Sequence, residues 1–144
     1  MTAARLRAGA VAALLAALPG CLPTLTAESL PPPGRTARLD AITGFWGVRG
    51  YRLELSQGVA IAVSCTASGP CEQLTASSDD PAIAEARPAA LNVLRPTGYS
   101  FNQQPAAAIV VVGKQPGRTT VRLHSAAGDR KIQITVAAPA VSAR

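Results

Sequence analysis

Aromatic residues are scarce in this sequence of 144 residues, which has one Trp, two Tyr and two Phe. Proteins that stack bases or sugars need aromatic platforms, so the small number of rings disfavours such a surface. Any hydrophobic core must be built mainly from Val, Ile, Leu and Ala, which suits a small β-sandwich. The length is enough for one modest domain with appended segments.

Charged residues are also sparse, at 15% of the sequence, and the basic ones form no cluster. Lys and Arg outnumber Asp and Glu by 14 to 8, but most of them are single arginines scattered along the chain. Nucleic-acid binding is typical of a concentrated basic surface. The sequence therefore predicts no nucleic-acid partner.

The sequence has a single histidine, His124, and few other groups suited to metal or catalytic chemistry. A zinc site needs further thiolates or histidines at suitable spacing. Asp79 and Asp80 are adjacent, but no other oxygen-rich cluster accompanies them, so we predict that they form a turn with Pro81. No motif of a serine nucleophile accompanies His124. We expect no metal site, no cofactor and no catalysis, and a small hydrolase is the remote alternative.

Residues 1–20 have the features of an export signal. Two arginines and no acid precede an apolar run over residues 8–18, which is too short to span a bilayer. The run ends in LPGC, which resembles the lipobox of bacterial lipoproteins, with Pro19 in place of the usual small residue. This resemblance implies that Cys21 is acylated and becomes the mature N-terminus. The alternative is an ordinary cleaved signal peptide with a cysteine nearby.

The lipoprotein resemblance also implies a location in the cell envelope. The lipid on Cys21 would attach the protein to a membrane, and several acyl chains hold a protein far more firmly than one. Leu22 follows the cysteine, at the position where aspartate typically signals inner-membrane retention in Gram-negative lipoproteins. We therefore expect the outer membrane, with the protein facing the periplasm or the cell surface.

The other two cysteines, Cys65 and Cys71, form an even pair once Cys21 is assigned to lipid. A Gly-Pro turn between them allows the two sulfur atoms to meet across the loop. Their spacing differs from the two-residue spacing of redox pairs. We predict a structural disulfide that closes a short loop.

Residues 21–38 are rich in proline and show no persistent helical or alternating pattern. Such a segment favours an extended conformation, so we predict a tether that holds the folded domain a few tens of ångströms from the membrane, at roughly 3 Å per residue. Residues 39–46 are ambiguous and could begin with an edge strand. Phe45 and Trp46 are expected to cap one end of the core, with ligand stacking by Trp46 as the alternative.

Residues 109–136 give the clearest structural signal, which is three strands joined by two turns. An apolar run over residues 109–112 precedes the turn GKQPG, and residues 118–125 then alternate between apolar and polar side chains. A turn at residues 127–129 leads to another alternating strand, so these two strands form a hairpin with one buried face. The similar alternation over residues 51–63 predicts a further hairpin.

Three segments together resemble a bacterial immunoglobulin-like domain of group 2. They are LELSQGVAIAVSC from Leu53, LTASSDDPAIAEA from Leu74 and VVVGKQPGRTTVRLHSAAGDRKIQITV from Val110. The resemblance implies an all-β, immunoglobulin-like antiparallel β-sandwich with a role in protein contact or spacing outside the cytoplasm. The pieces DPAIAEA and VVVGKQPGRTTV also resemble the small N-terminal domain of pilus-assembly secretins. Neither family implies a catalytic residue.

Residues 95–105 fall outside the family pattern and are predicted to form a long loop that carries Tyr99 and Phe101. Exposed aromatic residues on a loop are typical of interaction hot spots, so this loop is a candidate binding site. The alternative is that both rings fold back and close the open end of a core that is poor in aromatics.

These features predict a non-catalytic envelope lipoprotein with four parts. They are a lipoprotein signal peptide (1–20), a Pro-rich tether (21–38), the sandwich (39–137) and a disordered tail (138–144). The expected partner is an envelope protein or a surface polymer, and the expected role is binding, adhesion or spacing. The alternative is an accessory subunit of a secretion or pilus channel.

Overall fold

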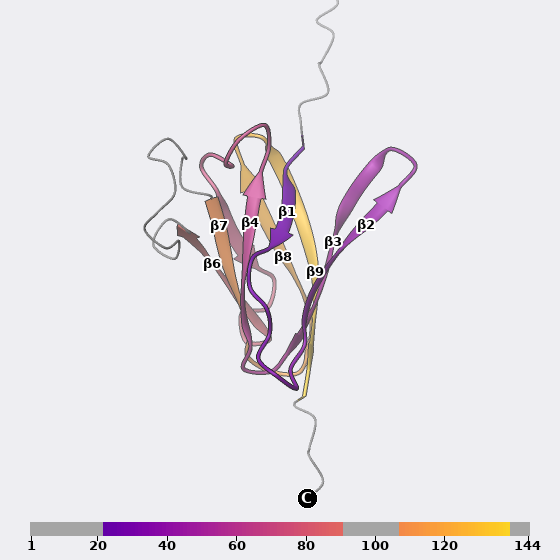
Figure 1. Cartoon of the computed structure of the whole chain (residues 1–144), viewed down its shortest axis with the longest axis vertical. Helices are drawn as coiled ribbons and strands as arrows, with labels where there is room; N and C mark the ends of the chain where they lie inside the picture. The colour runs from indigo at the N-terminus through magenta and orange to yellow at the C-terminus, as the bar shows by residue number, and fades with distance from the viewer. Residues whose placement is uncertain (1–21, 91–106, 139–144) are drawn as a thin grey trace, which may run out of the picture.

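The computed structural model describes residues 22–90 and 107–138, which form two β-sheets and no helix (Figure 1). The four-stranded sheet has the order β1-β4-β7-β6, formed by Thr24–Ala27, Ala60–Thr66, Ala107–Gly113 and Ala84–Ala90. The five-stranded sheet has the order β2-β3-β9-β8-β5, formed by Ala37–Gly44, Gly47–Ser56, Gly128–Ala137, Gly117–Ser125 and Thr75–Ser78. The predicted all-β sandwich is confirmed. Within these residues no helix is long and apolar enough to cross a membrane.

Seven of the strands follow the order of an immunoglobulin sandwich, in which strands A, B, E and D form one sheet and C, F and G form the other. In chain order, β1, β4, β5, β6, β7, β8 and β9 take the positions A to G. β2 and β3 are additional and are inserted between positions A and B. β3 runs parallel to β9, whereas an antiparallel sandwich was expected. The other strand pairs are antiparallel.

The core lies between the two sheets and is built from aliphatic side chains. In β8 and β9 the alternation follows the sequence-based prediction, because Val121, Leu123, Ile132 and Ile134 are buried and their neighbours face outward. Burying one such side chain contributes about 1.5 to 3 kcal/mol. The scarcity of aromatic residues is thus compensated by branched aliphatic residues from both sheets.

The turn at residues 56–59 joins the two sheets. β3 belongs to the five-stranded sheet and β4 to the four-stranded sheet, so the predicted hairpin over residues 51–63 is wrong. Gly58 has a φ of +79° and donates its N–H to the carbonyl oxygen of Gly113 in the opposite sheet. Alternation predicted both strands, but it cannot distinguish a hairpin from a connection between sheets.

The first described residues belong to the sandwich. Pro23 is buried, Leu25 lies in the core, and β1 pairs with β4. The predicted tether over residues 21–38 is wrong at two places, because β1 lies within it and β2 begins at Ala37. A strand as short as β1 has too few alternating positions to be recognised within a Pro-rich segment. The predicted signal peptide and the predicted tail beyond Ala138 lie outside the described residues.

Candidate functional site

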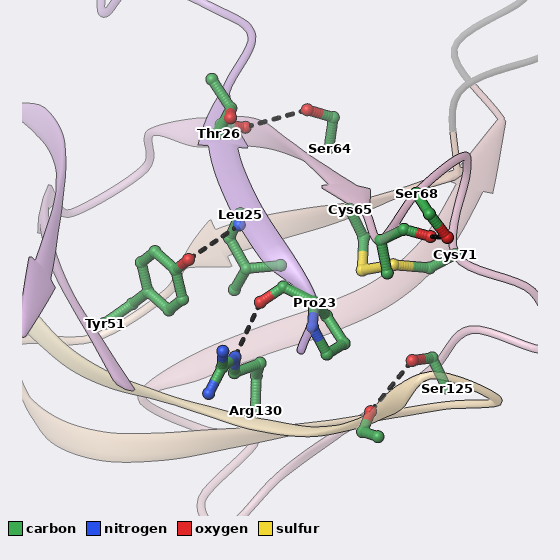
Figure 2. The surroundings of a disulfide bond; sticks show 12 residues. Pro23, Leu25, Thr26, Tyr51, Ser64, Cys65, Ser68, Cys71, Ser125 and Arg130 are labelled. Atoms are coloured by element: carbon green, nitrogen blue, oxygen red, sulfur yellow. Dashed lines mark hydrogen bonds between the residues drawn. A yellow bond between two sulfur atoms is a disulfide. The ribbon is translucent and has the colours of Figure 1, made fainter. Parts of the chain in front are cut away.

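Two polar side chains hold the start of β1 against the five-stranded sheet (Figure 2). The backbone N–H of Leu25 donates a hydrogen bond to the hydroxyl oxygen of Tyr51 at 2.9 Å. Nε of Arg130 donates to the carbonyl oxygen of Pro23 at 2.7 Å. Nη1 of the same guanidinium donates to the carbonyl oxygen of Val48 at 3.1 Å. Arg130 therefore ties the beginning of the sandwich to β3 close to the turn of the β2–β3 hairpin.

Arg130 has the strand parity of buried residues. It is only 9% exposed and points to the same side of β9 as Ile132 and Ile134. None of the ion pairs among the described residues includes Arg130, so backbone carbonyl groups take the place of a carboxylate. A buried guanidinium is tolerated only when its donors are satisfied. The role of this residue was not predicted from the sequence, although an arginine at an apolar position of a regular strand is a readable signal.

The predicted disulfide between Cys65 and Cys71 is present at the same end of the sandwich (Figure 2). The two Cα atoms are 5.4 Å apart, and both residues are buried. Cys65 lies on β4 opposite Leu25 of β1. The disulfide therefore stabilises β4 next to the first strand of the sandwich. A cross-link that closes so short a loop contributes about 2 kcal/mol by the chain-entropy estimate.

The turn of the β2–β3 hairpin leans away from β9, to the side of the sandwich (Figure 1). β9 pairs with β3 only from Tyr51 onward, so residues 47–50 pair with β2 alone. Gly50 is nevertheless buried next to Lys131, and Val48 packs against the core, so the hairpin stays in contact with the sandwich almost to its turn. Gly44 and Gly47 close it, and Gly47 has a φ of +102°, which glycine adopts readily.

Phe45 and Trp46 form the tip of this hairpin, and each is 89% exposed. Their rings pack edge to face with centroids 5.1 Å apart. The expectation that they cap the core is wrong, because the inserted hairpin carries them away from it. The sequence Gly-Phe-Trp-Gly between two extended segments could have placed these rings on a turn. Ligand stacking by Trp46 stays a prediction.

Arg49 lies just below the tip and is exposed. The register between β2 and β3 shifts at this point, so that Arg49 is the extra residue of a β-bulge. Its side chain lies over Gly44, where an added Cβ would collide with Nε of Arg49. Residues 41–51 contain no Asp or Glu. The tip therefore combines two exposed rings with one exposed positive charge.

Other residues singled out from the sequence lie elsewhere or outside the described residues. Cys21, Tyr99 and Phe101 are outside, so lipidation and the binding loop stay predictions. His124 is exposed on the outer face of β8, and its Nδ1 lies 2.5 Å from Oδ1 of Asp129. This pairing was not expected, because Asp129 had been assigned to the turn before the last strand. Both side chains are open to solvent.

Asp79 and Asp80 form the predicted turn. Oδ1 of Asp80 accepts a hydrogen bond from the backbone N–H of Ala82 at 3.0 Å, and Asp79 pairs with Arg122 on β8 at 3.1 Å. Across residues 22–90 and 107–138, no three His, Cys, Asp or Glu side chains are grouped so that they could hold a metal ion.

Glu85 on β6 takes part in a surface ion-pair cluster. Nζ of Lys114, in the connection between β7 and β8, donates to Oε2 of Glu85 at 3.0 Å. This hydrogen bond, and then the pairing with Arg87, hold the pKa of the Glu85 carboxyl below its ordinary value. The cluster links the edge strand β6 to the neighbouring connection.

Comparison with known proteins identifies no family. No protein-family model matches the chain, and no curated protein matches it. The crystal structure of the S-layer protein rSbsC(31-844) matches with a TM-score of 0.41 and 16% identity, over 79% of this chain and 13% of that chain. A structure of domains 4 and 5 of the S-layer protein SbsC matches with a TM-score of 0.40 and 16% identity, over 78% of this chain and 53% of that chain. This chain spans about half or less of the length of these chains, and similarities this low add nothing to an argument about function.

Proposed function

We propose that this protein is a non-catalytic lipoprotein of the bacterial cell envelope whose immunoglobulin-like sandwich is held directly against the membrane. The observation that carries this proposal is the position of Pro23, which is buried in the sandwich two residues after Cys21. Cys21 is the residue that the lipobox-like sequence marks for acylation. Leu22 alone therefore separates the proposed lipid from the folded domain.

The contacts around β1 support a module that lies on the membrane over one that stands away from it. Hydrogen bonds from Arg130 and to Tyr51 fix the backbone at Pro23 and Leu25. The disulfide next to this strand supports export, because such bonds persist in oxidising compartments such as the bacterial periplasm. The outer membrane is the proposed location, on the basis of Leu22.

The proposed role is binding, adhesion or spacing through surfaces that stay open when one end of the sandwich rests on the membrane. The outer face of the five-stranded sheet is such a surface. It is polar and rich in exposed basic side chains, namely Arg52, Arg118, Arg122 and Lys131. An envelope protein or a surface polymer is the partner that we propose for it.

Cys21→Ala tests the anchor. We expect the parent to fractionate with membranes and to yield an acylated peptide that begins at Cys21. The variant should escape lipoprotein processing, and its mature form should leave the membrane fraction. Joint replacement of Cys65 and Cys71 by Ala is the control, because it removes two thiols without touching the lipobox and should leave the protein membrane-bound. Equal partition of parent and Cys21→Ala, with no acyl mass, would contradict the proposal.

Affinity capture from cross-linked cell envelopes tests the role. Recovery of a carbohydrate or surface protein supports a binding module. Stoichiometric recovery of a secretion or pilus channel component would instead support the accessory-subunit alternative.

A further inference from the structure

The exposed tip of the β2–β3 hairpin lies at the end of the sandwich where the described chain begins. Figure 1 shows the start of β1 and the hairpin tip at the same end, opposite the end of β9. The contacts agree, because Arg130 bonds to both Pro23 and Val48. An added Cβ at Gly128, where β9 begins, would lie 3.5 Å from Cδ2 of Leu22. A lipid on the preceding residue would thus place the membrane at this end.

The hairpin tip has the chemistry of a membrane interface. Tryptophan gathers at bilayer interfaces because its ring is apolar while its indole N–H still reaches water or headgroups. Phe45 adds a second apolar ring, and Arg49 adds a positive charge that complements anionic phospholipids. No acidic residue between positions 41 and 51 would oppose this contact.

The shape of the hairpin also suits insertion. The two rings stand on a narrow stem closed by Gly44 and Gly47, and an added Cβ at Gly47 would meet nothing within 4 Å. The stem is anchored because β3 continues from Tyr51 into the core. The hairpin is not one of the seven strands that follow the immunoglobulin order. The sandwich can therefore form without two aromatic rings at this turn.

We propose that Phe45 and Trp46 insert into the interfacial region of the membrane that carries the lipid of Cys21, with Arg49 against the phosphate groups. This inference rests on the lipid anchor proposed above. The acyl chains retain the protein, whereas the hairpin adds a second point of contact. Two points of contact at one end define how the sandwich is oriented on the bilayer.

Trp46 is the single tryptophan of the chain, so its fluorescence tests the inference directly. The acylated protein is purified from membranes and reconstituted in vesicles of phosphatidylethanolamine and phosphatidylglycerol. We expect the emission to shift to shorter wavelength relative to the unacylated Cys21→Ala protein in buffer. Phospholipids brominated near the headgroup should quench the emission more strongly than phospholipids brominated near the end of the acyl chain.

Three variants retain the fluorescent probe. Phe45→Ser should reduce quenching by the brominated lipids, because one inserted ring is lost. Arg49→Gln should reduce it more strongly in phosphatidylglycerol vesicles than in phosphatidylcholine vesicles, because only the former carry a net negative surface charge. Leu30→Ser is the matched control, because Leu30 is 94% exposed but follows Glu28, which bonds to Ala62 toward the opposite end of the sandwich. It should leave the quenching unchanged.

The outcomes separate this inference from the proposed function. An acylated protein whose Trp46 emission is quenched by aqueous iodide and not by brominated lipid would overturn the inference and leave the lipid anchor intact. A mature protein without acyl mass on Cys21 would overturn the anchor and the inference together. A photo-reactive amino acid at position 46 should cross-link to lipid in cells, and an adduct with a protein or with a second copy of this chain would overturn the membrane contact.

Discussion

Arg130 joins two parts of the chain that are far apart in sequence, because one guanidinium binds the carbonyl oxygens of Pro23 and Val48. Both acceptors lie near the start of the fold, where the membrane is proposed to be. The residue therefore links three features of the molecule, namely the beginning of β1, the part of the hairpin next to its turn and the core strand β9. Replacing Arg130 should therefore lower the free energy of unfolding.

Arg130→Met should lower the free energy of unfolding by about 2 to 4 kcal/mol. The substitution removes the donor to one buried carbonyl group (Pro23) and one partly buried carbonyl group (Val48), at about 1 to 3 kcal/mol each, and relief of the buried charge offsets part of this cost. Urea denaturation at neutral pH measures the change. Arg52→Met is the matched control, because Arg52 is exposed on β3. This substitution should change the free energy of unfolding by no more than about 0.5 kcal/mol. Equal losses in the two variants would argue against the role given to Arg130.

The lowered pKa of Glu85 predicts how its ion pairs respond to acid. Because folding favours the carboxylate, the stabilisation is present above the ordinary pKa of 4.5 and is lost as the pH falls through the lower pKa of the folded state. Glu85→Gln should therefore be less stable than the parent at neutral pH, and the two should converge in acid. Urea midpoints across this pH range measure the effect. A difference that is independent of pH would exclude the ion pairs as its cause.

Among the elements, the strands with long alternating patterns could be predicted from sequence. β8 and β9 show the expected burial because apolar and polar residues alternate along nearly their whole length. β1 could not be recognised, since it has four residues next to prolines and its identity depends on pairing with β4. The lipid anchor and the loop with Tyr99 and Phe101 remain predictions from sequence alone.

The hairpin tip was placed wrongly because two large apolar residues in an aromatic-poor chain suggested a core position. Only the tertiary structure shows that the turn of the hairpin leans away from the core and leaves both rings exposed (Figure 1). Arg130 was missed for a related reason, since its hydrogen bonds depend on the position of β1. Local pattern predicts which face a side chain takes, but tertiary pairing decides whether that face is covered.

Joint replacement of Phe45 and Trp46 by Ser should leave stability nearly unchanged. Both rings are 89% exposed, so the change should stay within about 0.5 kcal/mol, or at most about 4 °C in Tm. Circular dichroism on heating measures this without the tryptophan signal. Joint replacement of the buried Leu53 and Ile132 by Ala is the contrasting control and should cost several kcal/mol. A comparable loss in the tip variant would restore the assignment of these rings to the core.

For the whole molecule, the central feature is that the fold begins next to the proposed lipid. An immunoglobulin-like framework is joined at one end by the disulfide, the inserted hairpin and the start of the chain. The end of β9 lies at the other end (Figure 1). With the proposed lipid on Cys21, this polarity would turn one end toward the membrane and leave the sheet faces open to the proposed partners.

Neutron reflectometry of the acylated protein on a supported bilayer tests this account most directly, because it measures the distance between the lipid headgroups and the protein layer. With Pro23 buried two residues after Cys21, the protein layer should begin at the headgroups, with no intervening layer of water. Residues 21–38 as an extended tether would instead hold the protein away at roughly 3 Å per residue. A hydrated gap of a few tens of ångströms would contradict the account.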